Sequence, residues 1–278
     1  MEKIEIKVKN TDKLSNVLLN YGFSYNNINK IIRNKDVRID GIKTNVDGIV
    51  FNGQVLTIFV ATLPQDKFKK VFEDENILVI DKMSGIEVEG EDGLEGKIPG
   101  VIAVHRLDRN TEGVLVMAKN KQAEKELSEA IKKQMFDKKY LAEVVGKTNF
   151  KGEKYTAYLV KDSKTSSVKI YNNFVQGAVK IETIFKTLKN GSETSIVEAT
   201  LITGKTHQIR AHLAFLGNAI VGDGKYGKNE DNKKFKEKKQ KLHCYYLKIN
   251  GINGKLSYLN GRKFISLPDW AKTLNINI

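Results

Sequence analysis

Titratable side chains gather in one short segment of the sequence, residues 105–113, which reads HRLDRNTEG. The segment lies between two apolar stretches, IAV and VLVMA, that are typical of strands. An imidazole, two guanidinium groups and a carboxylate in a turn between strands are the groups that bind and transform polar substrates where a cleft forms. A charged turn with local salt bridges would explain the arginines and the aspartate, but not the apolar stretches on both sides. The segment is therefore a candidate catalytic turn.

A second polar cluster, residues 203–212 with the sequence TGKTHQIRAH, follows the strand-like VEATLI and is predicted to open a helix. Three of the four histidines fall in these two clusters, whereas histidines on a random surface would scatter more.

Several common kinds of site do not fit these clusters. A phosphate-binding P-loop needs a glycine five residues before Gly204, and that position holds Ala199. His207 and His212 are five residues apart, so on a helix they point to different faces and not toward one metal ion. Cys244 is the only cysteine, which excludes a disulfide framework and a multi-cysteine zinc site, and no G-x-S-x-G elbow occurs. We therefore expect no metal and no cofactor.

The clusters belong to a longer pattern. In chain order, the segments HRLDRNTEGVLVMAKN, KKYLAEVVG, LITGKTHQIRAHLAFLGNAIVGDGKYG and LHCYYLKI resemble the RluA family of pseudouridine synthases. The earlier VFEDENILVIDKMSG is similar to the opening strand pair of that family, and the resemblance covers nearly the whole chain. The chain departs from the family pattern at three places. Met83 stands where the family usually has a proline after Lys82, and Glu112 stands where it has a small serine. Residues 87–95, which are rich in acidic side chains, form a shorter insert than the family usually has.

The resemblance implies an isomerase that converts uridine in RNA to pseudouridine without a cofactor. Asp108 matches the essential aspartate, which attacks the sugar or stabilises its cationic form and then leaves. Arg210 matches the arginine that would pair with Asp108, and Tyr140 matches the tyrosine that stacks on the target base. From residue types alone, core packing is the preferred explanation of Tyr140.

The resemblance also implies residues that bind the substrate, because the target base has to be turned out of the RNA. Arg106 resembles the residue that fills the space the base leaves, with a phosphate contact or a salt bridge as the alternative. His105 is expected to orient the turn, Ile209 to line the uracil pocket and Lys205 to contact phosphate. His207 and Gln208 are expected to place the loop, and His212 to be structural.

Residues 1–62 are predicted to form a small α+β domain. Asn10 and Thr11 are expected to cap a helix that ends at Gly22, a second helix starts at Ser24 or Asn26, and a hairpin and a closing strand follow. The segments INKIIRNKDVRIDGIKTN and NGQVLTI resemble the S4 RNA-binding domain. The resemblance implies a basic face that holds RNA phosphates, with the candidates Lys30, Arg33, Lys35, Arg38 and Lys43. A small domain that merely packs is the alternative.

Residues 63–70 are predicted to be a linker and residues 71–278 the catalytic domain. A helix is expected over residues 121–134, and alternating segments between residues 154 and 202 predict several strands. No repeating βαβ spacing occurs, which favours an α+β fold with a mixed, mostly antiparallel sheet, flanking helices and an active-site cleft.

The charge supports a polyanionic partner. The 278 residues include 47 lysines and arginines against 33 acidic residues, a net charge of +14. A lysine-rich surface kept for solubility is the alternative. The acidic segment, residues 73–95, carries a net charge of −8, and we expect it on a face turned away from bound RNA. The sequence has no membrane-spanning stretch and no signal peptide, so we expect a cytoplasmic monomer that binds RNA and no membrane.

Together these features predict a pseudouridine synthase with an aspartate nucleophile that acts on 23S ribosomal RNA. The alternatives are a transfer-RNA-directed synthase and a non-catalytic RNA-binding protein of the same fold. A metal-dependent nuclease would need clustered carboxylates near a lysine. The spacing of the acidic residues in the acidic segment does not match such a site.

Overall fold

The computed structural model describes residues 2–23, 25–60, 67–162 and 165–271. Contacts along the chain divide it into two compact units. Unit 1 comprises Met1–Arg109, Leu115–Lys133 and Gly251–Asn260, and unit 2 comprises Asn110–Val114, Gln134–Asn250 and Gly261–Ile278. The candidate catalytic turn is therefore divided between the units, with residues 105–109 in unit 1 and residues 110–113 in unit 2, and the second polar cluster lies in unit 2.

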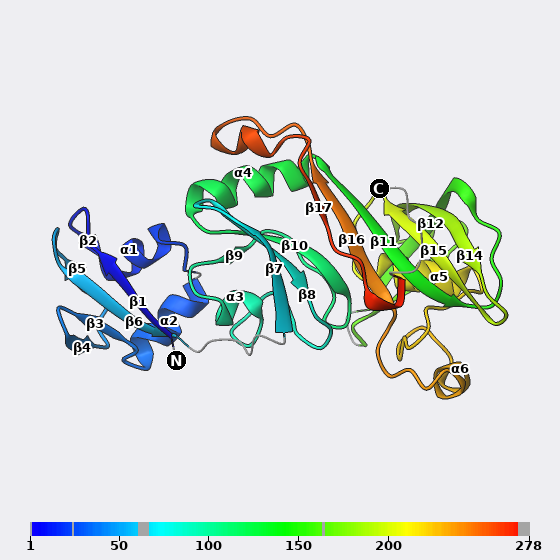
Figure 1. Cartoon of the computed structure of the whole chain (residues 1–278), viewed down its shortest axis with the longest axis horizontal. Helices are drawn as coiled ribbons and strands as arrows, with labels where there is room; N and C mark the ends of the chain where they lie inside the picture. Colours follow the sequence, from blue (N-terminus) through cyan, green and yellow to red (C-terminus); the bar gives the residue numbers. More distant parts are fainter. Residues whose placement is uncertain (1, 24, 61–66, 163–164, 272–278) are drawn as a thin grey trace. The chain divides into compact units, whose positions relative to one another are not determined.

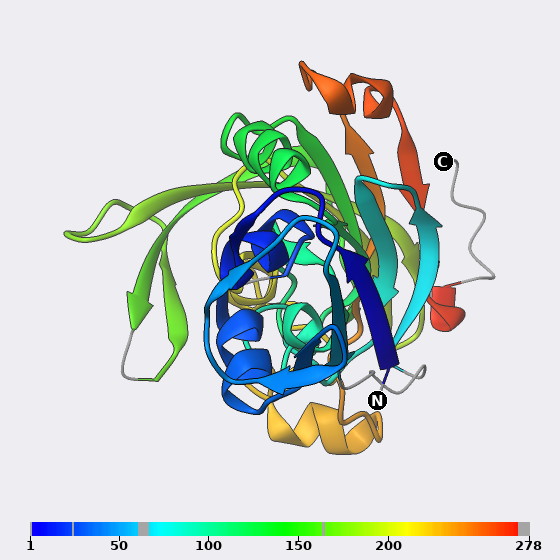
Figure 2. The ribbon, with the colours of Figure 1, turned by 90° about the vertical axis from the view of Figure 1, so that its left-hand side faces the viewer.

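The N-terminal part of unit 1 has a core of its own. The antiparallel strand order β1-β6-β3-β4 is formed by Glu2–Lys7, Val55–Val60, Val37–Ile39 and Ile42–Thr44. Two helices, α1 (Leu14–Asn20) and α2 (Tyr25–Arg33), pack beside this sheet (Figures 1 and 2). Their buried side chains and those of the strands form one apolar cluster, which lies entirely within residues 6–58.

The hairpin predicted in this region is confirmed. Val37 faces Thr44 and Ile39 faces Ile42 across the two strands. The turn residues Asp40 and Gly41 have φ values of 48° and 85°. Positive φ at both central positions is what a two-residue turn of the right twist requires, and Asp-Gly adopts it readily.

The predicted cap of the first helix is wrong. Helix α1 begins at Leu14 without a side-chain cap, because Asp12–Lys13 (β2) instead pairs with Ile49–Val50 (β5). The first amides of the helix are satisfied from that neighbouring segment. The Leu14 amide donates to the Gly48 carbonyl at 2.8 Å and the Ser15 amide to the Asp47 carboxylate at 2.8 Å.

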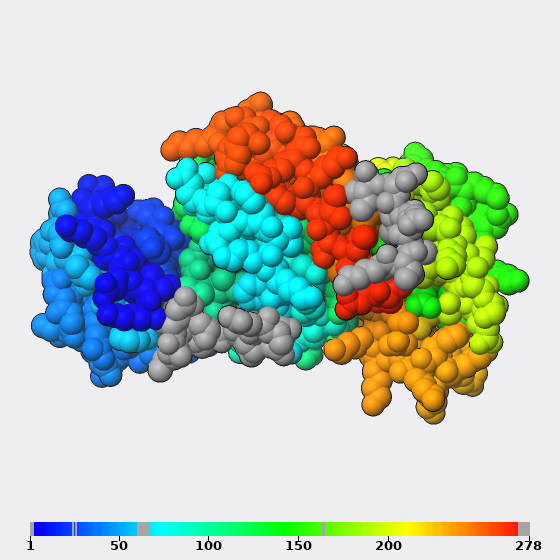
Figure 3. Space-filling model, viewed as in Figure 1, coloured from blue at the N-terminus to red at the C-terminus, as the bar shows by residue number. Residues whose placement is uncertain are grey.

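The rest of unit 1 packs around a buried strand. Strand β8 (Ile77–Lys82) has six buried residues and pairs antiparallel with β7 (Phe68–Glu73). The other elements are α3 (Leu94–Lys97), β9 (Ile102–Ala103), α4 (Lys121–Lys132) and the 3-10 helix η2 (Lys255–Leu259). Helix α4 confirms the predicted helix and ends two residues earlier than expected. Tyr258 of η2 donates a 2.6 Å hydrogen bond to Asp74 after β7, where the two segments touch in the space-filling view (Figure 3).

Unit 2 is built on long antiparallel strands. Their order β13-β12-β14-β15-β11-β16 is formed by Ser167–Tyr171, Lys151–Asp162, Val179–Asn190, Thr194–Leu201, Phe136–Val145 and Leu242–Ile249. Strand β17 (Lys263–Ile265) pairs with β16. Strand β10 (Glu112–Ala118) begins in unit 2, where its first two residues run parallel to β16, and continues into unit 1.

Helices cover part of the unit 2 sheet. Helix α5 (Gln208–Phe215) packs on one face, where Ala211 joins a cluster with Ala157, Leu159 and Ile181. On β11 and β16, Leu141 and Tyr245 are covered by the C-terminal segment that contains the 3-10 helix η3 (Asp269–Ala271). The short helix α6 is Asn229–Lys234. The predicted α+β class, with a mixed and mostly antiparallel sheet, is confirmed.

The predicted domain boundaries stay open. The proposed linker begins among residues 61–66, which lie outside the described residues, so the boundaries 1–62, 63–70 and 71–278 remain predictions. Among the helices of the described ranges, none has the length and apolar composition needed to cross a membrane.

Candidate active site

The candidate catalytic turn is anchored by a buried histidine. His105 follows β9, and its Nε2 accepts a 3.0 Å hydrogen bond from the Val116 amide in β10. Leu107 is buried and Asp108 is half-buried between exposed Arg106 and Arg109. The buried side chains of His105 and Leu107, both before Asp108 in the chain, anchor the backbone of the turn, whereas Asp108 itself is only half-buried. The His105 contact is the kind that the predicted orienting role requires.

Lys82 holds the backbone of the same turn through hydrogen bonds. Its side chain is fully buried, and Nζ donates to the carbonyls of Met83, Ile86 and Arg109 at 3.0, 2.9 and 3.0 Å. The Gly85 amide also donates to the Arg109 carbonyl at 2.9 Å. Burying an ammonium group is costly unless its protons are bonded, and three carbonyl acceptors meet that need. The sequence prediction did not assign Lys82 to the site, although a lysine two residues after the apolar run ILVI was a usable signal.

Arg106 contacts the acidic segment. Its guanidinium lies 2.9 Å from the Glu89 carboxylate and 3.9 Å from that of Glu87, and the Arg106 side chain is 58% exposed. Two glutamates of the acidic segment thus lie beside the candidate catalytic turn, and the expectation that residues 73–95 face away from bound RNA remains a prediction. Opposite charges attract, and the acidic segment provides the partner that Arg106 uses in the absence of RNA.

The second cluster is held in place by Gln208. Its Oε1 accepts from Thr203 Oγ1 at 2.9 Å and from the Lys205 amide at 3.0 Å. Its Nε2 donates to Thr183 Oγ1 at 3.0 Å and to the Glu182 carbonyl at 3.1 Å. All four hydrogen bonds of one buried side chain thus tie the loop before α5 to strand β14. Lys205 itself is exposed in this loop.

Arg210 is fixed by Asp223, a residue that the sequence prediction did not assign to the site. Nε of Arg210 donates to Asp223 Oδ2 at 2.7 Å and Nη2 to Oδ1 at 3.0 Å. The carboxylate also accepts from the amides of Lys225 and Tyr226 at 2.8 and 3.1 Å. Burial acts to raise the pKa of Asp223, but the hydrogen bonds and charge of Arg210 together with the two backbone amides outweigh it and hold this pKa below its ordinary value.

The partner expected for Arg210 was Asp108. These two residues belong to different units, and their pairing remains a prediction. A signal for Asp223 existed in the GDGKYG segment, which carried the resemblance without being assigned a role.

Two histidines flank Arg210 along the chain. His207 has a left-handed backbone with φ of 53°, and its Nδ1 lies 2.8 Å from the Tyr226 hydroxyl. The Tyr226 ring in turn stacks against the Arg210 guanidinium, 5.3 Å from the ring centre. His212 is buried against the Phe185 ring, and burial lowers its pKa to about 4, so it is neutral at pH 7. This environment agrees with the structural role predicted for His212.

Tyr140 lies on the sheet face that carries α5. It is 6% exposed and faces Ala199 across the strand pair, and Ala199 in turn faces Phe185, whose ring contacts His212. Residues that face each other on neighbouring strands project to the same side of a sheet. Ile209, in α5, is also buried. Tyr140, Ile209 and Arg210 therefore belong to one unit and one side of its sheet.

Glu112, which stands where the family usually has a serine, begins β10. Its carboxylate lies 3.9 Å from Nδ1 of buried His243, and the preceding Thr111 accepts a 2.7 Å hydrogen bond from Gln240. These contacts place Glu112 against β16.

The basic residues predicted to hold RNA lie in the N-terminal part of unit 1. Arg38 and Lys43 face each other across the β3–β4 hairpin, and the Arg38 guanidinium lies 5.0 Å from the centre of the Phe59 ring. Lys30 and Arg33 end α2, and Lys30 lies 4.0 Å from Glu91. Lys35 follows the helix with a positive φ of 58°.

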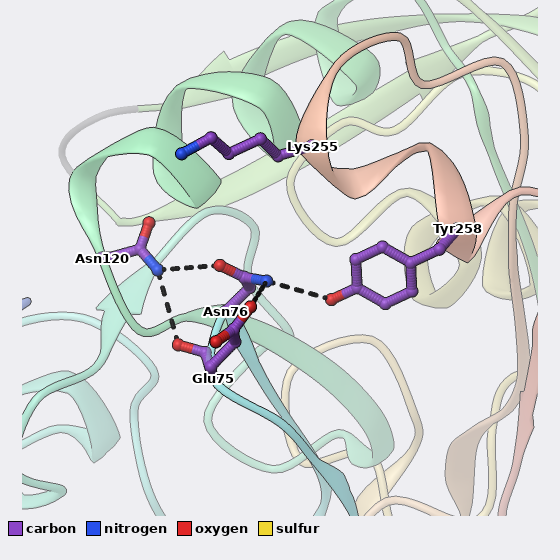
Figure 4. A pocket seen from close by; sticks show the side chains of 5 residues that line it. All are labelled: Glu75, Asn76, Asn120, Lys255 and Tyr258. Carbon is purple, nitrogen blue, oxygen red and sulfur yellow. Dashed lines mark hydrogen bonds between the residues drawn. The ribbon is translucent and has the colours of Figure 1, made fainter.

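A separate polar pocket of about 550 Å³ lies elsewhere in unit 1 (Figure 4). It is lined by Glu75, Asn76, Asn120, Lys255 and Tyr258. Its amides bond to each other and to the backbone: Asn120 Nδ2 donates to Asn76 Oδ1 at 3.1 Å and to the Glu75 carbonyl at 3.4 Å. None of the predicted site residues lines it. Within the described ranges, no three histidine, cysteine or acidic side chains are grouped as a metal site would require.

Comparison with known proteins gives one consistent result. The family model described as RNA pseudouridylate synthase matches residues 76–215, a region that contains both polar clusters. The ribosomal large subunit pseudouridine synthase C of Vibrio vulnificus is 31% identical over 227 residues, which cover 72% of this chain and 71% of that protein. An uncharacterised RNA pseudouridine synthase of Mycoplasma genitalium is 35% identical over 219 residues, 66% of this chain and 64% of that protein.

A solved structure shares the fold. Human RNA pseudouridylate synthase domain containing 1 superposes with a TM-score of 0.59 at 23% identity, over 74% of this chain and 92% of that one.

Proposed function

The chain belongs to the RNA pseudouridylate synthase family and is therefore an isomerase, and we propose that its substrate is the ribosomal RNA of the large subunit. The observation that carries the proposal is the family match over residues 76–215, because that region contains Asp108, Tyr140 and Arg210. The similarity to the ribosomal large subunit pseudouridine synthase C of Vibrio vulnificus supports the proposed class of RNA.

The chemistry we propose begins at Asp108. Its carboxylate adds to C1′ of the ribose as the N1–C1′ bond breaks, and the uracil leaves with the electron pair. The uracil then turns, C5 attacks C1′ and the carboxylate is released. The proton on C5 is lost to a base, and N1 gains one. Substrate and product have the same atoms, so no co-reactant is consumed. A carboxylate suits both steps because it is a nucleophile and a leaving group.

Arg210 and Tyr140 are proposed to complete the site. Arg210 would pair with Asp108, and its bidentate contact with Asp223 supports this role because a guanidinium held on one edge has a fixed orientation. Tyr140 would stack on the uracil, with Ile209 lining the same pocket. Burial of both side chains on the α5 side of the sheet supports a dry, apolar pocket for the base.

Arg106 is proposed to fill the space that the target base leaves in the RNA. The exposure of its side chain supports this role. Its contacts with Glu87 and Glu89 are solvent-exposed ion pairs, which contribute little free energy and are easily exchanged. RNA binding would therefore exchange two carboxylates for phosphate or base contacts.

The N-terminal part of unit 1 is proposed to be an S4-like domain that holds RNA. Its separate apolar core and the basic pair Arg38 and Lys43 on the hairpin support this proposal. Such contacts position an RNA and carry little sequence information.

Mapping pseudouridines in cellular RNA tests the proposed substrate. Large-subunit ribosomal RNA from cells with and without the gene is treated with a pseudouridine-specific reagent and read by primer extension. We expect at least one pseudouridine to disappear with the gene and to return when the wild-type gene is restored. An unchanged ribosomal pattern with sites lost only in transfer RNA would contradict the proposal.

A further inference from the structure

The unit 2 sheet has a second face at β12, β13 and β14. Ala157, Leu159 and Ile181 point toward α5 and are buried there. Successive side chains of a strand point to opposite faces, so Tyr158 and Lys180 point away from α5. On β11 and β16, by contrast, the residues around Tyr245 are covered by Leu267 and Trp270 of the C-terminal segment.

This second face presents aromatic rings beside lysines. Lys180, Tyr158 and Tyr171 form one row across the three strands, since Tyr158 faces both of the others in register. Phe174 follows β13 and contacts the Tyr158 ring edge-on at 5.9 Å between centres. Lys169 lies one row further, opposite Val160. We name these five residues, Tyr158, Tyr171, Phe174, Lys169 and Lys180, the aromatic platform.

The platform is open to solvent. Tyr171 is 36% exposed and Phe174 is 67% exposed, and strand β13 is at the edge of the sheet order. Large apolar rings at such positions are not explained by the core, because the core of this region lies on the α5 side. In Figure 2 the β12 and β13 strands are the light green pair that ends at the grey trace.

The charge around the platform is positive. Residues 151–190 contain eight lysines and three acidic residues, a net charge of +5. Glu182 accepts ion pairs from both Lys154 and Lys180, each at 3.0 Å, so two lysines share one carboxylate. Lys169 makes no ion pair with any residue in the described part of the chain. A polyanion therefore complements this face better than a protein of mixed charge does.

Exposed rings beside lysines on an open sheet bind unpaired nucleotides by stacking, while the ammonium groups contact phosphates. We propose that the aromatic platform binds an unpaired segment of the RNA substrate, with bases on Tyr171 and Phe174 and phosphates at Lys169 and Lys180. The proposal deepens and rests on the function proposed above. It adds an RNA contact on the face of the sheet opposite to α5.

The test uses the full chain and a labelled RNA stem-loop with one uridine in the loop. The same stem-loop is made with ten unpaired adenosines at either end, so that the tail offers bases but no substrate. For the wild-type chain, we expect the better of the two tails to tighten binding at least about fivefold. Tyr171→Ala/Phe174→Ala should lose this gain, while binding of the tailless RNA stays the same.

The matched control is Tyr171→Phe/Phe174→Tyr, which keeps both rings and should keep the gain. Lys169→Gln/Lys180→Gln should lower the salt dependence of tailed-RNA binding by about 1.4 in the slope of log K against log salt. Thermal unfolding followed by circular dichroism verifies that each variant is folded.

Two results overturn the proposal. One is a wild-type chain that binds tailed and tailless RNA equally, and the other is an alanine pair that keeps the gain from the tail. Conversion of the loop uridine is measured in the same samples. A chain that converts the uridine without any gain from the tail refutes the platform alone, whereas a gain from the tail without conversion refutes the proposed function and leaves the platform as an RNA-binding surface.

Discussion

The buried pair of Arg210 and Asp223 fixes one side chain of the proposed active site before any substrate binds. A guanidinium that reaches toward a substrate has many rotamers, and each lost rotamer costs free energy when the substrate binds. Asp223 removes that freedom in advance through two hydrogen bonds, at 2.7 and 3.0 Å. Lys82 does the same for the backbone of the catalytic turn through three carbonyl contacts. We propose that both are positioning residues.

Replacement of Asp223 by alanine leaves the Arg210 charge buried without its carboxylate. We expect Asp223→Ala to lower the free energy of unfolding by about 3–5 kcal/mol, the usual effect of removing one partner of a buried pair. Urea denaturation measures it. Glu193→Ala, which removes an exposed partner of Lys234, is the control and should change stability by less than about 1 kcal/mol. Equal effects of the two substitutions would contradict the claim that the buried Arg210–Asp223 pair stabilises the fold more than an exposed ion pair does.

The neutral His212 predicts a pH dependence of stability. Its pKa is about 4 in the folded chain, against about 6.5 when unfolded, so the unfolded chain binds a proton that the folded chain does not as the pH falls below 6.5. Stability is therefore complete above pH 6.5 and is lost toward pH 4. Between pH 7.5 and 5, this histidine should lower the free energy of unfolding by about 2 kcal/mol.

Urea denaturation at pH 7.5 and at pH 5 provides the measurement. His212→Gln retains a hydrogen-bonding group near Thr183 and cannot titrate, so it should remove about 2 kcal/mol of the pH dependence. The same pH dependence in the wild-type chain and in this variant would show that His212 is not its source.

Strands and helices were predicted well where the pattern is local. The β3–β4 hairpin and α4 were predicted from turn residues and apolar spacing; the hairpin lies where expected, and α4 begins where expected and ends two residues early. The cap of α1 was not, because its amides are satisfied by Asp47 and Gly48, more than thirty residues away in sequence. Local patterns cannot supply such long-range partners. The same limit explains Lys82 and Asp223, whose roles depend on backbone or side-chain partners from other elements.

At the level of elements, Gly113 allows β10 to begin against β16. Its φ is 114°, and a Cβ at this position would lie 2.3 Å from the Cys244 carbonyl oxygen. We expect Gly113→Ala to lower the free energy of unfolding by more than about 4 kcal/mol. The added Cβ would meet the backbone of β16, which cannot move aside without disturbing the strand pair. Soluble yield and urea denaturation measure the loss.

Gly177→Ala is the matched control. Gly177 also has a positive φ, 80°, but a Cβ there would have no neighbour within 4 Å. It should cost only the conformational strain of about 1–2 kcal/mol. If both substitutions have the same effect, the close approach of β10 to β16 is not what the glycine is needed for.

Over the whole molecule, the net charge of +14 is divided among parts with different roles. We propose that the N-terminal basic residues and the lysines of residues 151–190 contact RNA, whereas Glu87 and Glu89 of the acidic segment hold Arg106. The sequence predicted the charge imbalance but not this contact, because only the folded chain brings residues 87–89 to the catalytic turn. Charge at this scale sets the strength and salt dependence of binding more than the chemistry.

Neutralising two exposed basic residues of the proposed S4-like domain tests its proposed role in RNA binding. Arg33→Gln/Lys43→Gln should weaken binding to ribosomal RNA and reduce the slope of log K against log salt by about 1 to 2. The reason is that fewer counterions are released on binding when two phosphate contacts are lost. Conversion of a minimal stem-loop should be unchanged. The control Lys3→Gln/Lys13→Gln removes the same charge from lysines already paired with Glu5 and Asp47 and should change the slope less. A larger change with the control would place the RNA on another face of the domain.

The central claim is that Asp108 carries the isomerisation of uridine in RNA. Its most direct test is single-turnover conversion of a large-subunit ribosomal RNA transcript by the wild-type chain and by Asp108→Asn, with RNA affinity measured on the same preparations. The substitution keeps the size of the side chain and removes the nucleophile, so we expect pseudouridine formation to fall at least about 1,000-fold while affinity changes less than about threefold. Conversion by Asp108→Asn at the wild-type rate would contradict the mechanism.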